Sequence, residues 1–281
     1  MSSDSVDGNG LMDRKLLSKV TLHRPQMKLA HLASICLAVI LLGVAELAAR
    51  ESWVSDFILP TPSSTWNALM EGFGSGQLIR HGSSTLFATG MGFVAATVLG
   101  LGFATVLTAI PFLRSTLMPF VVAVQSLPKI AIAPMVVLWL GFGLNGKIAV
   151  VTIVSFFPIF INSLQGLQLR DEDQHNLMRS LNASRMQLFL HLRLPGGLPF
   201  IFAGLHIGII FSLIGTIVAE FVGSSSGLGY LLLQARALFH VPEAFAILVL
   251  LMIMGLVLDS VMTVLERRLT PWARDVTQIS P

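Results

Sequence analysis

Two glycine-rich patterns are the first places in this sequence where residue types and spacing could do chemistry. Residues 141–147 read Gly-Phe-Gly-Leu-Asn-Gly-Lys, which matches the start of a phosphate-binding loop. In such a loop, backbone N–H groups and the lysine hold phosphates, and a following Ser or Thr holds Mg²⁺. Ile148 occupies that last position. We therefore interpret 141–147 as a glycine-rich chain reversal between apolar segments, and not as a nucleotide site.

The second pattern, Gly-Ser-Ser-Ser-Gly at 223–227, has the spelling of a hydrolase nucleophile elbow. That elbow requires a buried strand before the serine and a helix of a soluble sheet after it. Neither is indicated by the sequence here. A base would have to come from His206 or His240, and nothing in the sequence places either beside Ser225. We predict neither a catalytic residue nor a metal site in this chain.

Lys129 deserves more weight because it lies inside an apolar segment, close to its middle. A charge at the centre of a bilayer costs roughly 2.5 to 3.5 kcal/mol on insertion scales and persists where it faces a partner or water. Pro128 and Pro134 flank this stretch and would break a helix there, which frees backbone polar groups. Two interpretations stay open: Lys129 faces an anion or works in a gate, or it forms a buried ion pair with Glu220 or Glu46.

Two further features of the apolar segments have structural explanations. Asp259 lies near the inner end of the last segment, where its carboxylate can reach water. Gly204 and Gly208 have the four-residue spacing that lets two helices approach closely, so we interpret them as packing positions.

The composition shows which solvent surrounds these residues. Of 281 residues, 54% are hydrophobic and 12% charged, with a mean hydropathy of +0.78. Soluble domains carry about 25% charged residues, so most of this chain must face lipid. The single Cys36 excludes an intramolecular disulfide. The isoelectric point near 9.4 comes from basic residues at the borders of apolar segments, which is typical of membrane topology and does not indicate nucleic-acid binding.

Six apolar segments reach the roughly 20 residues that a membrane-spanning helix needs. They cover 29–49, 83–110, 117–140, 148–166, 199–221 and 243–265. The first exceeds the roughly 7 to 15 apolar residues of a signal peptide, so we predict a retained helix. The expected fold is an all-α polytopic membrane protein with about six transmembrane helices.

The distribution of basic residues predicts that both termini are cytoplasmic. A basic tail covers 1–28, a second tail covers 268–281, and an outer loop covers 50–79 with one short helix around 65–70. Basic residues on the inner side are Arg114, Arg170, Arg179, Arg185, Arg193, Arg267, Arg268 and Arg274, whereas Arg50, Arg80, Lys147 and Arg236 lie in the outer loops.

The inner loop at 167–198 is long, charged and amphipathic, although it lies between two spans. Its leucines at 177, 181, 188 and 192 recur at helical spacing, and a Leu-Pro pair at 194–195 closes the run. Asn182 interrupts the pattern, and Asn enters the left-handed conformation easily, so we expect a turn between two short helices. The loop either docks on a protein partner or lies as an amphipathic helix on lipid.

Four stretches together resemble a known family. They are 125–145, Asn-Ala-Ser-Arg-Met-Gln at 182–187, 194–206 and 215–231. Across roughly 80–267, the chain is similar to permease subunits of type I binding-protein-dependent ABC importers, in the group that carries nitrate, sulfonates and taurine.

The resemblance gives the inner loop a role, because in that family it forms two coupling helices that dock on a cytoplasmic ATPase. The family hallmark is a Glu-Ala-Ala triplet, a later Gly and a closing Leu-Pro. Here Asn176, Leu177 and Met178 occupy the triplet and Asn182 the Gly position. Only the frame and the Leu-Pro are kept. The implied coupling residues are Asn176, Arg179, Asn182, Arg185 and Pro195.

The resemblance also implies an assembly in the bacterial inner membrane. Two copies of this chain would enclose a path for a small anionic solute, with two ATP-binding subunits inside and a solute-binding protein outside. ATP and Mg²⁺ would bind to the ATPase, and this chain would hold no cofactor of its own. Path or gate residues would be Gln125, Lys129 and Glu220. An ion-coupled secondary transporter is the alternative, although we find no internal repeat of the kind common in that class.

Overall fold

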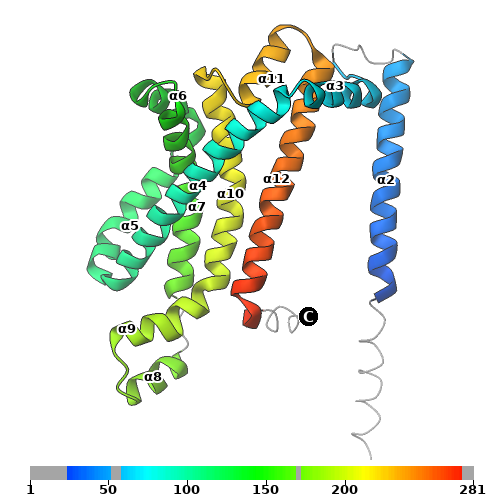
Figure 1. The fold of residues 1–281 in the computed structure, drawn as a ribbon. Helices are drawn as coiled ribbons and strands as arrows, with labels where there is room; N and C mark the ends of the chain where they lie inside the picture. Colours follow the sequence, from blue (N-terminus) through cyan, green and yellow to red (C-terminus); the bar gives the residue numbers. More distant parts are fainter. Residues whose placement is uncertain (1–23, 52–57, 169–171, 274–281) are drawn as a thin grey trace, which may run out of the picture. The chain divides into compact units, whose positions relative to one another are not determined.

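The computed structural model describes residues 24–51, 58–168 and 172–273, and it contains helices but no strand among them (Figure 1). The chain divides into two units, 1–64 and 65–281, which we describe separately. Most of the N-terminal tail, most of the C-terminal tail, Arg170 and Arg274 lie outside the described residues.

The first unit consists of helix α2 (Arg24–Arg50) and the chain that follows it. The predicted first span, 29–49, lies within α2. Near the end of this helix the Glu46 carboxylate accepts hydrogen bonds from Arg50 Nε at 2.7 Å and from the Ser63 hydroxyl at 2.8 Å. Thr61 begins the next helix, because its Oγ1 accepts the backbone N–H of Ser64 at 3.1 Å.

Helix α3 (Pro62–Gly74) contains the short helix expected at 65–70 and extends it in both directions. Pro62 at its first position is compatible with a helix start, since no intrahelical hydrogen bond needs its missing N–H.

Four helices of the second unit are long and apolar enough to cross a membrane: α4 (Gln77–Ala109), α7 (Leu144–Gln168), α10 (Leu194–Gly223) with the turns before it, and α12 (Val241–Leu269). Helix α7 packs on both α4 and α10. The predicted packing glycines lie in this contact: a Cβ at Gly208 would come within 2.6 Å of Ile159, and one at Gly204 within 2.8 Å of Asn162. Their lack of a side chain lets the two helices approach closely.

The segment 117–140 is not one continuous span, contrary to the sequence prediction. It is divided between α5 (Pro111–Gln125) and α6 (Lys129–Leu140), which meet at an angle of 92°. Pro128 explains the break, because proline disfavours a helical conformation in the residue before it. The second predicted breaker, Pro134, lies inside α6 without ending it.

The start of α10 also differs from prediction, because the Leu-Pro pair at 194–195 does not end the helical run. A five-residue π-helix, Phe189–Arg193, joins short α9 (Arg185–Leu188) directly to α10. A proline ring would clash with a carbonyl of the preceding turn in a regular α-helix, and the wider π-turn makes room for Pro195. Helical structure therefore continues over 39 residues, from Arg185 to Gly223.

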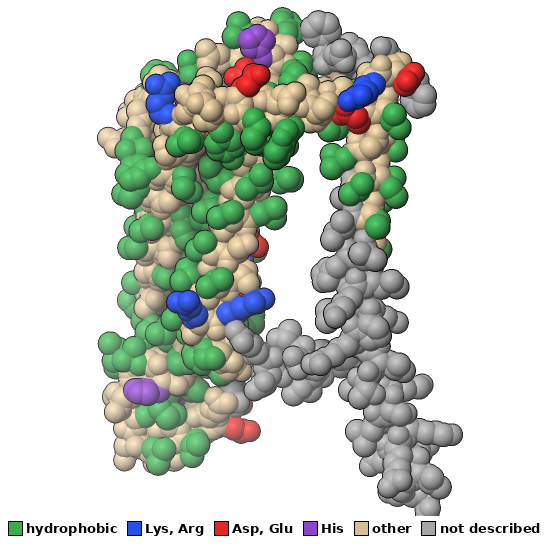
Figure 2. Space-filling view, turned by 45° about the vertical axis from the view of Figure 1, so that its right-hand side comes forward, with side chains coloured by type: hydrophobic (Ala, Val, Ile, Leu, Met, Phe, Trp, Pro, Cys, Tyr) green, Lys and Arg blue, Asp and Glu red, His purple; other side chains and the backbone are tan. Residues whose placement is uncertain are grey.

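The two ends of the second unit carry different elements. Helix α8 (Glu172–Ser180) and α9 extend from one end, which we call the α8–α9 end. The opposite end, the α11 end, carries α6 and α11 (Leu228–Ala237), a helix that the sequence analysis did not predict in the loop 222–242. In Figure 2, Lys and Arg side chains of this unit lie at two levels, separated by a largely hydrophobic band.

Candidate functional site

Helices α8 and α9 form a hairpin that turns at Asn182. This residue has a φ of +56°, the left-handed conformation that the sequence analysis expected. The turn is closed by the Ala183 N–H, which donates to the Met178 carbonyl at 3.0 Å. Ser184 then caps α9 in a reciprocal arrangement with Gln187. The predicted break between two short helices is therefore confirmed.

The hairpin exposes apolar side chains in spite of its high charge. Leu177 is 62% exposed, Leu181 70% and Met186 65%, whereas Leu188 is buried against the rest of the unit. Of the four leucines in the expected pattern, Leu188 is buried, Leu192 is partly buried, and Leu177 and Leu181 are exposed in the single chain. A cluster of exposed apolar residues of this kind is typical of a docking surface.

Four of the predicted coupling residues lie on this hairpin, and the fifth lies where the hairpin joins α10. Asn176 and Arg179 are exposed on α8, Asn182 is exposed at the turn, and Arg185 is exposed at the start of α9. Pro195 is half-buried in the first turn of α10.

A second feature is a cavity at the break between α5 and α6. Its volume is about 480 Å³ and it lies against the middle of α7 and α10. Gln125, Pro128, Lys129 and Ile130 line it from the break, Val154, Phe157, Pro158, Ile161 and Asn162 from α7, and Ile207 and Phe211 from α10. Two predicted path residues, Gln125 and Lys129, are therefore brought together here.

The ammonium group of Lys129 is held at the wall of this cavity. Its Nζ donates to the Gln125 carbonyl at 3.0 Å and lies 4.8 Å from the centre of the Phe157 ring. An ammonium over an aromatic face is attracted by the ring electrons. Neither partner carries a negative charge.

The predicted ion pair of Lys129 with Glu220 is wrong, whereas a pair with Glu46, which lies in the first unit, stays a prediction. Glu46 pairs with Arg50, and Glu220 pairs with Lys147. Among the described residues of the second unit, no carboxylate forms an ion pair with Lys129. Glu220 also does not line the cavity, so the structure separates it from the other two predicted path residues.

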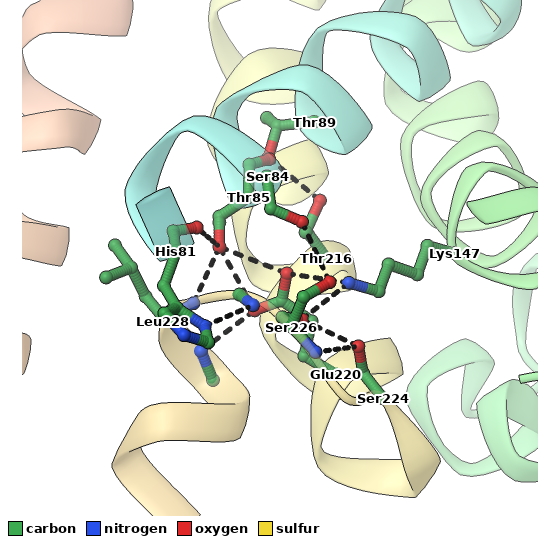
Figure 3. A network of polar contacts seen from close by, with 12 residues as sticks. His81, Ser84, Thr85, Thr89, Lys147, Thr216, Glu220, Ser224, Ser226 and Leu228 are labelled. Carbon is green, nitrogen blue, oxygen red and sulfur yellow. Dashed lines mark hydrogen bonds and ion pairs between the residues drawn. The ribbon is translucent and has the colours of Figure 1, made fainter. Parts of the chain in front are cut away.

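Glu220 instead lies at the centre of a buried polar network at the α11 end (Figure 3). Its carboxylate is 3.3 Å from Lys147 Nζ, and it accepts the Gly229 N–H at 2.8 Å. The Thr85 hydroxyl lies 3.0 Å and 3.1 Å from its two oxygens. The network joins α4, α7 and α10 through side chains that are almost completely buried.

The same network fixes the loop between α10 and α11. Lys147 Nζ also donates to the Ser226 carbonyl at 2.7 Å, and the Leu228 N–H donates to Thr85 Oγ1 at 2.8 Å. Gly227 has a φ of +114°, and a Cβ there would collide with the Glu220 carboxylate. Backbone groups therefore hold the loop, and the Ser224 hydroxyl adds hydrogen bonds to the Ser226 carbonyl at 2.6 Å and from the Ser226 N–H at 3.1 Å.

A third polar cluster lies between α10 and α12. His206 Nδ1 is 2.7 Å from an Asp259 oxygen, and His206 Nε2 is 3.2 Å from a Glu266 oxygen. Asp259 was expected only to reach water, but it also binds this histidine. His240 pairs with Glu243 instead, so both histidines considered as a base for Ser225 are engaged elsewhere.

Comparison with known proteins shows which family this chain belongs to. The model of the family described as binding-protein-dependent transport system inner membrane component matches residues 96–271, which include the cavity, the hairpin and Glu220. The chain belongs to this family. It is therefore a permease subunit of an ABC importer, and the alternative of an ion-coupled secondary transporter is excluded.

Relatives of this permease include transport proteins for different solutes. A riboflavin transport system permease protein, RibX, from Chloroflexus aurantiacus is 38% identical over 216 residues, covering 77% of this chain and 81% of RibX. The taurine transport system permease protein TauC of Escherichia coli is 27% identical, covering 95% of this chain and 98% of TauC.

Solved structures agree on the fold. A chain from inward-facing conformations of the MetNI methionine ABC transporter has a TM-score of 0.58 at 22% identity, covering 66% of this permease and 93% of that chain.

Sequence reasoning missed the partnership of Lys147 with Glu220 in this permease. Lys147 was assigned to an outer loop because it precedes an apolar run by one residue. A signal was present, since Lys147 lies at the start of one span and Glu220 at the end of an oppositely directed one. Opposite charges at the same membrane level on neighbouring spans predict a pair, although the sequence does not say which spans are neighbours.

Proposed function

We propose that two copies of this permease enclose a solute path and that the α8–α9 hairpin couples this path to an ATP-binding subunit. The observation that carries the proposal is the hairpin, with Leu177, Leu181 and Met186 exposed beside charged residues. Apolar anchors with a polar rim fit a protein partner better than lipid, because an interfacial helix needs one continuous apolar face. Helix α8 is only nine residues long before the chain turns at Asn182.

The connection between hairpin and path supports mechanical coupling. Helical structure runs without a turn from Arg185 through the π-helix to Gly223. The same helix carries Ile207 and Phe211 in the cavity wall, and Glu220 in the network at the far end. A displacement of the hairpin would therefore move the cavity wall, while the buried network holds the α11 end.

The partner subunit would bind ATP with Mg²⁺ and hydrolyse it, and a solute-binding protein would deliver the solute from outside. The resemblance between this chain and importer permeases supports that arrangement, and the glycine-rich pattern at 141–147 lacks the Ser or Thr that would hold Mg²⁺ in a nucleotide site. Lys147 of that pattern is committed to Glu220 and to the Ser226 carbonyl.

The test is affinity purification of the permease from its native membrane, followed by identification and assay of any ATPase that accompanies it. We expect a separate ATPase to copurify, and we expect the double variant Leu177→Ser, Leu181→Ser to reduce its recovery at least about tenfold, since buried apolar anchors dominate such interfaces.

Leu238→Ser is the matched control. Leu238 is 57% exposed and lies at the α11 end, remote from the hairpin. It should leave recovery of the ATPase unchanged. Purification of the permease without any nucleotide-binding partner, or an equal loss in both variants, would contradict the coupling role of the hairpin.

A further inference from the structure

We infer that the cavity beside Lys129 selects an organic anion with an apolar body, and that Phe157 and Phe211 determine this specificity together with Lys129. The inference rests on the proposed solute path and adds the chemical class of solute. It excludes a small inorganic anion such as nitrate as the preferred occupant.

The depth of the cavity places it on a transmembrane path. Phe157 is the fourteenth of the 25 residues of α7, and Ile207 is the fourteenth of the 30 residues of α10. At 1.5 Å per residue, each lies about 20 Å from the start of its helix. The cavity is therefore near the middle of the apolar band, where a charged group needs a functional or structural reason.

The charge of Lys129 supplies one half of the selectivity. Its ammonium has three N–H donors, and one of them is used by the Gln125 carbonyl. No carboxylate of the described residues of the second unit forms an ion pair with it, because Glu220 already pairs with Lys147. An unneutralised cation on a cavity wall attracts an anionic ligand and rejects a cationic one.

The walls supply the other half. Apart from Lys129 and Gln125, the lining has one polar side chain, Asn162, whose amide donates to the Pro158 carbonyl at 2.8 Å. The remaining surface is aliphatic or aromatic, with Phe157 under the ammonium and Phe211 on the facing helix α10. An apolar ligand body would displace water from these walls, which is favourable.

The size of the cavity also fits a ligand that has both a charged group and an apolar body. A volume of about 480 Å³ is within the usual range of organic ligand sites, roughly 300 to 1,000 Å³. Nitrate, with four heavy atoms, could meet the ammonium but would leave the apolar walls unused. An anion with a ring or alkyl chain can meet both.

The experiment measures equilibrium binding of radiolabelled benzenesulfonate to the purified complex of permease and ATPase, without binding protein. Unlabelled nitrate and benzenesulfonamide serve as competitors, because nitrate has the charge without the ring and the sulfonamide has the ring without the charge. We expect saturable benzenesulfonate binding that unlabelled benzenesulfonate displaces at a concentration at least about tenfold lower than either competitor requires.

Variants assign this binding to the cavity. Lys129→Gln should weaken benzenesulfonate binding at least about tenfold, Lys129→Arg should retain it, and Phe157→Leu or Phe211→Leu should weaken it about threefold or more. Arg114→Gln and Phe120→Leu are matched controls, because both residues are exposed on α5 and neither lines the cavity. They should leave binding unchanged.

The outcomes separate this inference from the proposed function. Equal displacement by nitrate, no saturable benzenesulfonate binding, or unchanged binding in Lys129→Gln would overturn the inference, even where an ATPase copurifies and drives uptake. Failure to recover any ATPase would overturn the proposed function instead, whatever the permease alone binds.

Discussion

A buried ion pair joins Lys147 to Glu220, and each charge compensates the other in the protein interior. The side chains are 6% and 0% exposed. Removing one partner of a buried pair leaves the other charge without compensation, which typically destabilises a protein by about 3 to 5 kcal/mol. We expect Lys147→Met to lower the free energy of unfolding by that amount, as measured by denaturant unfolding of the purified permease in detergent.

A double variant tests the pairing itself. Lys147→Met combined with Glu220→Gln removes both charges, so it should be more stable than Lys147→Met alone. Strict additivity of the two single substitutions would show that the residues do not interact.

A second prediction at the residue scale concerns the effect of a side chain at Gly227 on stability. Its φ of +114° is unfavourable for residues with a side chain, and a Cβ would collide with the Glu220 carboxylate. Gly227→Ala should therefore destabilise the permease by about 2 kcal/mol or more, measured by the same unfolding assay. Gly102→Ala is the control, since Gly102 is helical and a Cβ there meets open space. It should leave stability unchanged or raise it by up to about 1 kcal/mol. Equal effects would refute the steric argument.

At the scale of elements, the geometry of the α8–α9 hairpin depends on one backbone conformation. Asn182 has a φ of +56°, where β-branched residues are strained by about 1 to 2 kcal/mol. Asn182→Gly should preserve ATPase recovery in the pull-down, and Asn182→Val should reduce it several-fold by changing the angle between the helices. If both variants recover the ATPase equally well, the turn does not position the docking surface.

The contact between α10 and α12 depends on His206. Its Nδ1 lies 2.7 Å from an Asp259 oxygen and its Nε2 lies 3.2 Å from a Glu266 oxygen, so one side chain of α10 contacts two carboxylates of α12. His206→Ala removes the group between two carboxylates. We expect a loss of about 1 kcal/mol in unfolding free energy, less than for Lys147→Met, because Asp259 and Glu266 are 47% and 36% exposed.

The control for His206 is His240→Ala. His240 pairs with Glu243 at an exposed position, where ion pairs contribute little. No measurable change is expected there, and a larger loss for His240→Ala than for His206→Ala would contradict the proposed importance of the α10–α12 cluster.

At the scale of the whole molecule, the basic residues predict which end of the bundle faces the cytoplasm. Cys36 is the only cysteine, so Cys36→Ser provides a background for single labels. Ser180 on α8 and Ser225 after α10 are both exposed, at opposite ends of the second unit. In intact cells whose outer membrane has been made permeable, a membrane-impermeant maleimide should label Ser225→Cys. Ser180→Cys should react only after the inner membrane is opened. The reverse pattern would overturn the predicted orientation.

The sequence determined the features that depend on local patterns. Hydropathy marked the long helices α4, α7, α10 and α12, because a lipid solvent requires about 20 apolar residues in each. The conformational preference of asparagine located the turn at 182. Pro128 and Pro134 indicated a broken helix, but 117–140 was still predicted as one span, and only Pro128 lies at the break. Four motif stretches together led to the family.

Tertiary structure decided which distant residues meet, and there the sequence analysis was incomplete. Glu220 was one of two predicted acidic partners of Lys129, but it pairs with Lys147 on α7, and Lys129 binds the Gln125 carbonyl instead. The cavity that unites Lys129 with Phe211, 82 positions further along the chain, exists only through the packing of α7 and α10 against the break. Hydrophobic periodicity fixes how each helix buries itself, but the choice of neighbours follows from close packing of many side chains at once.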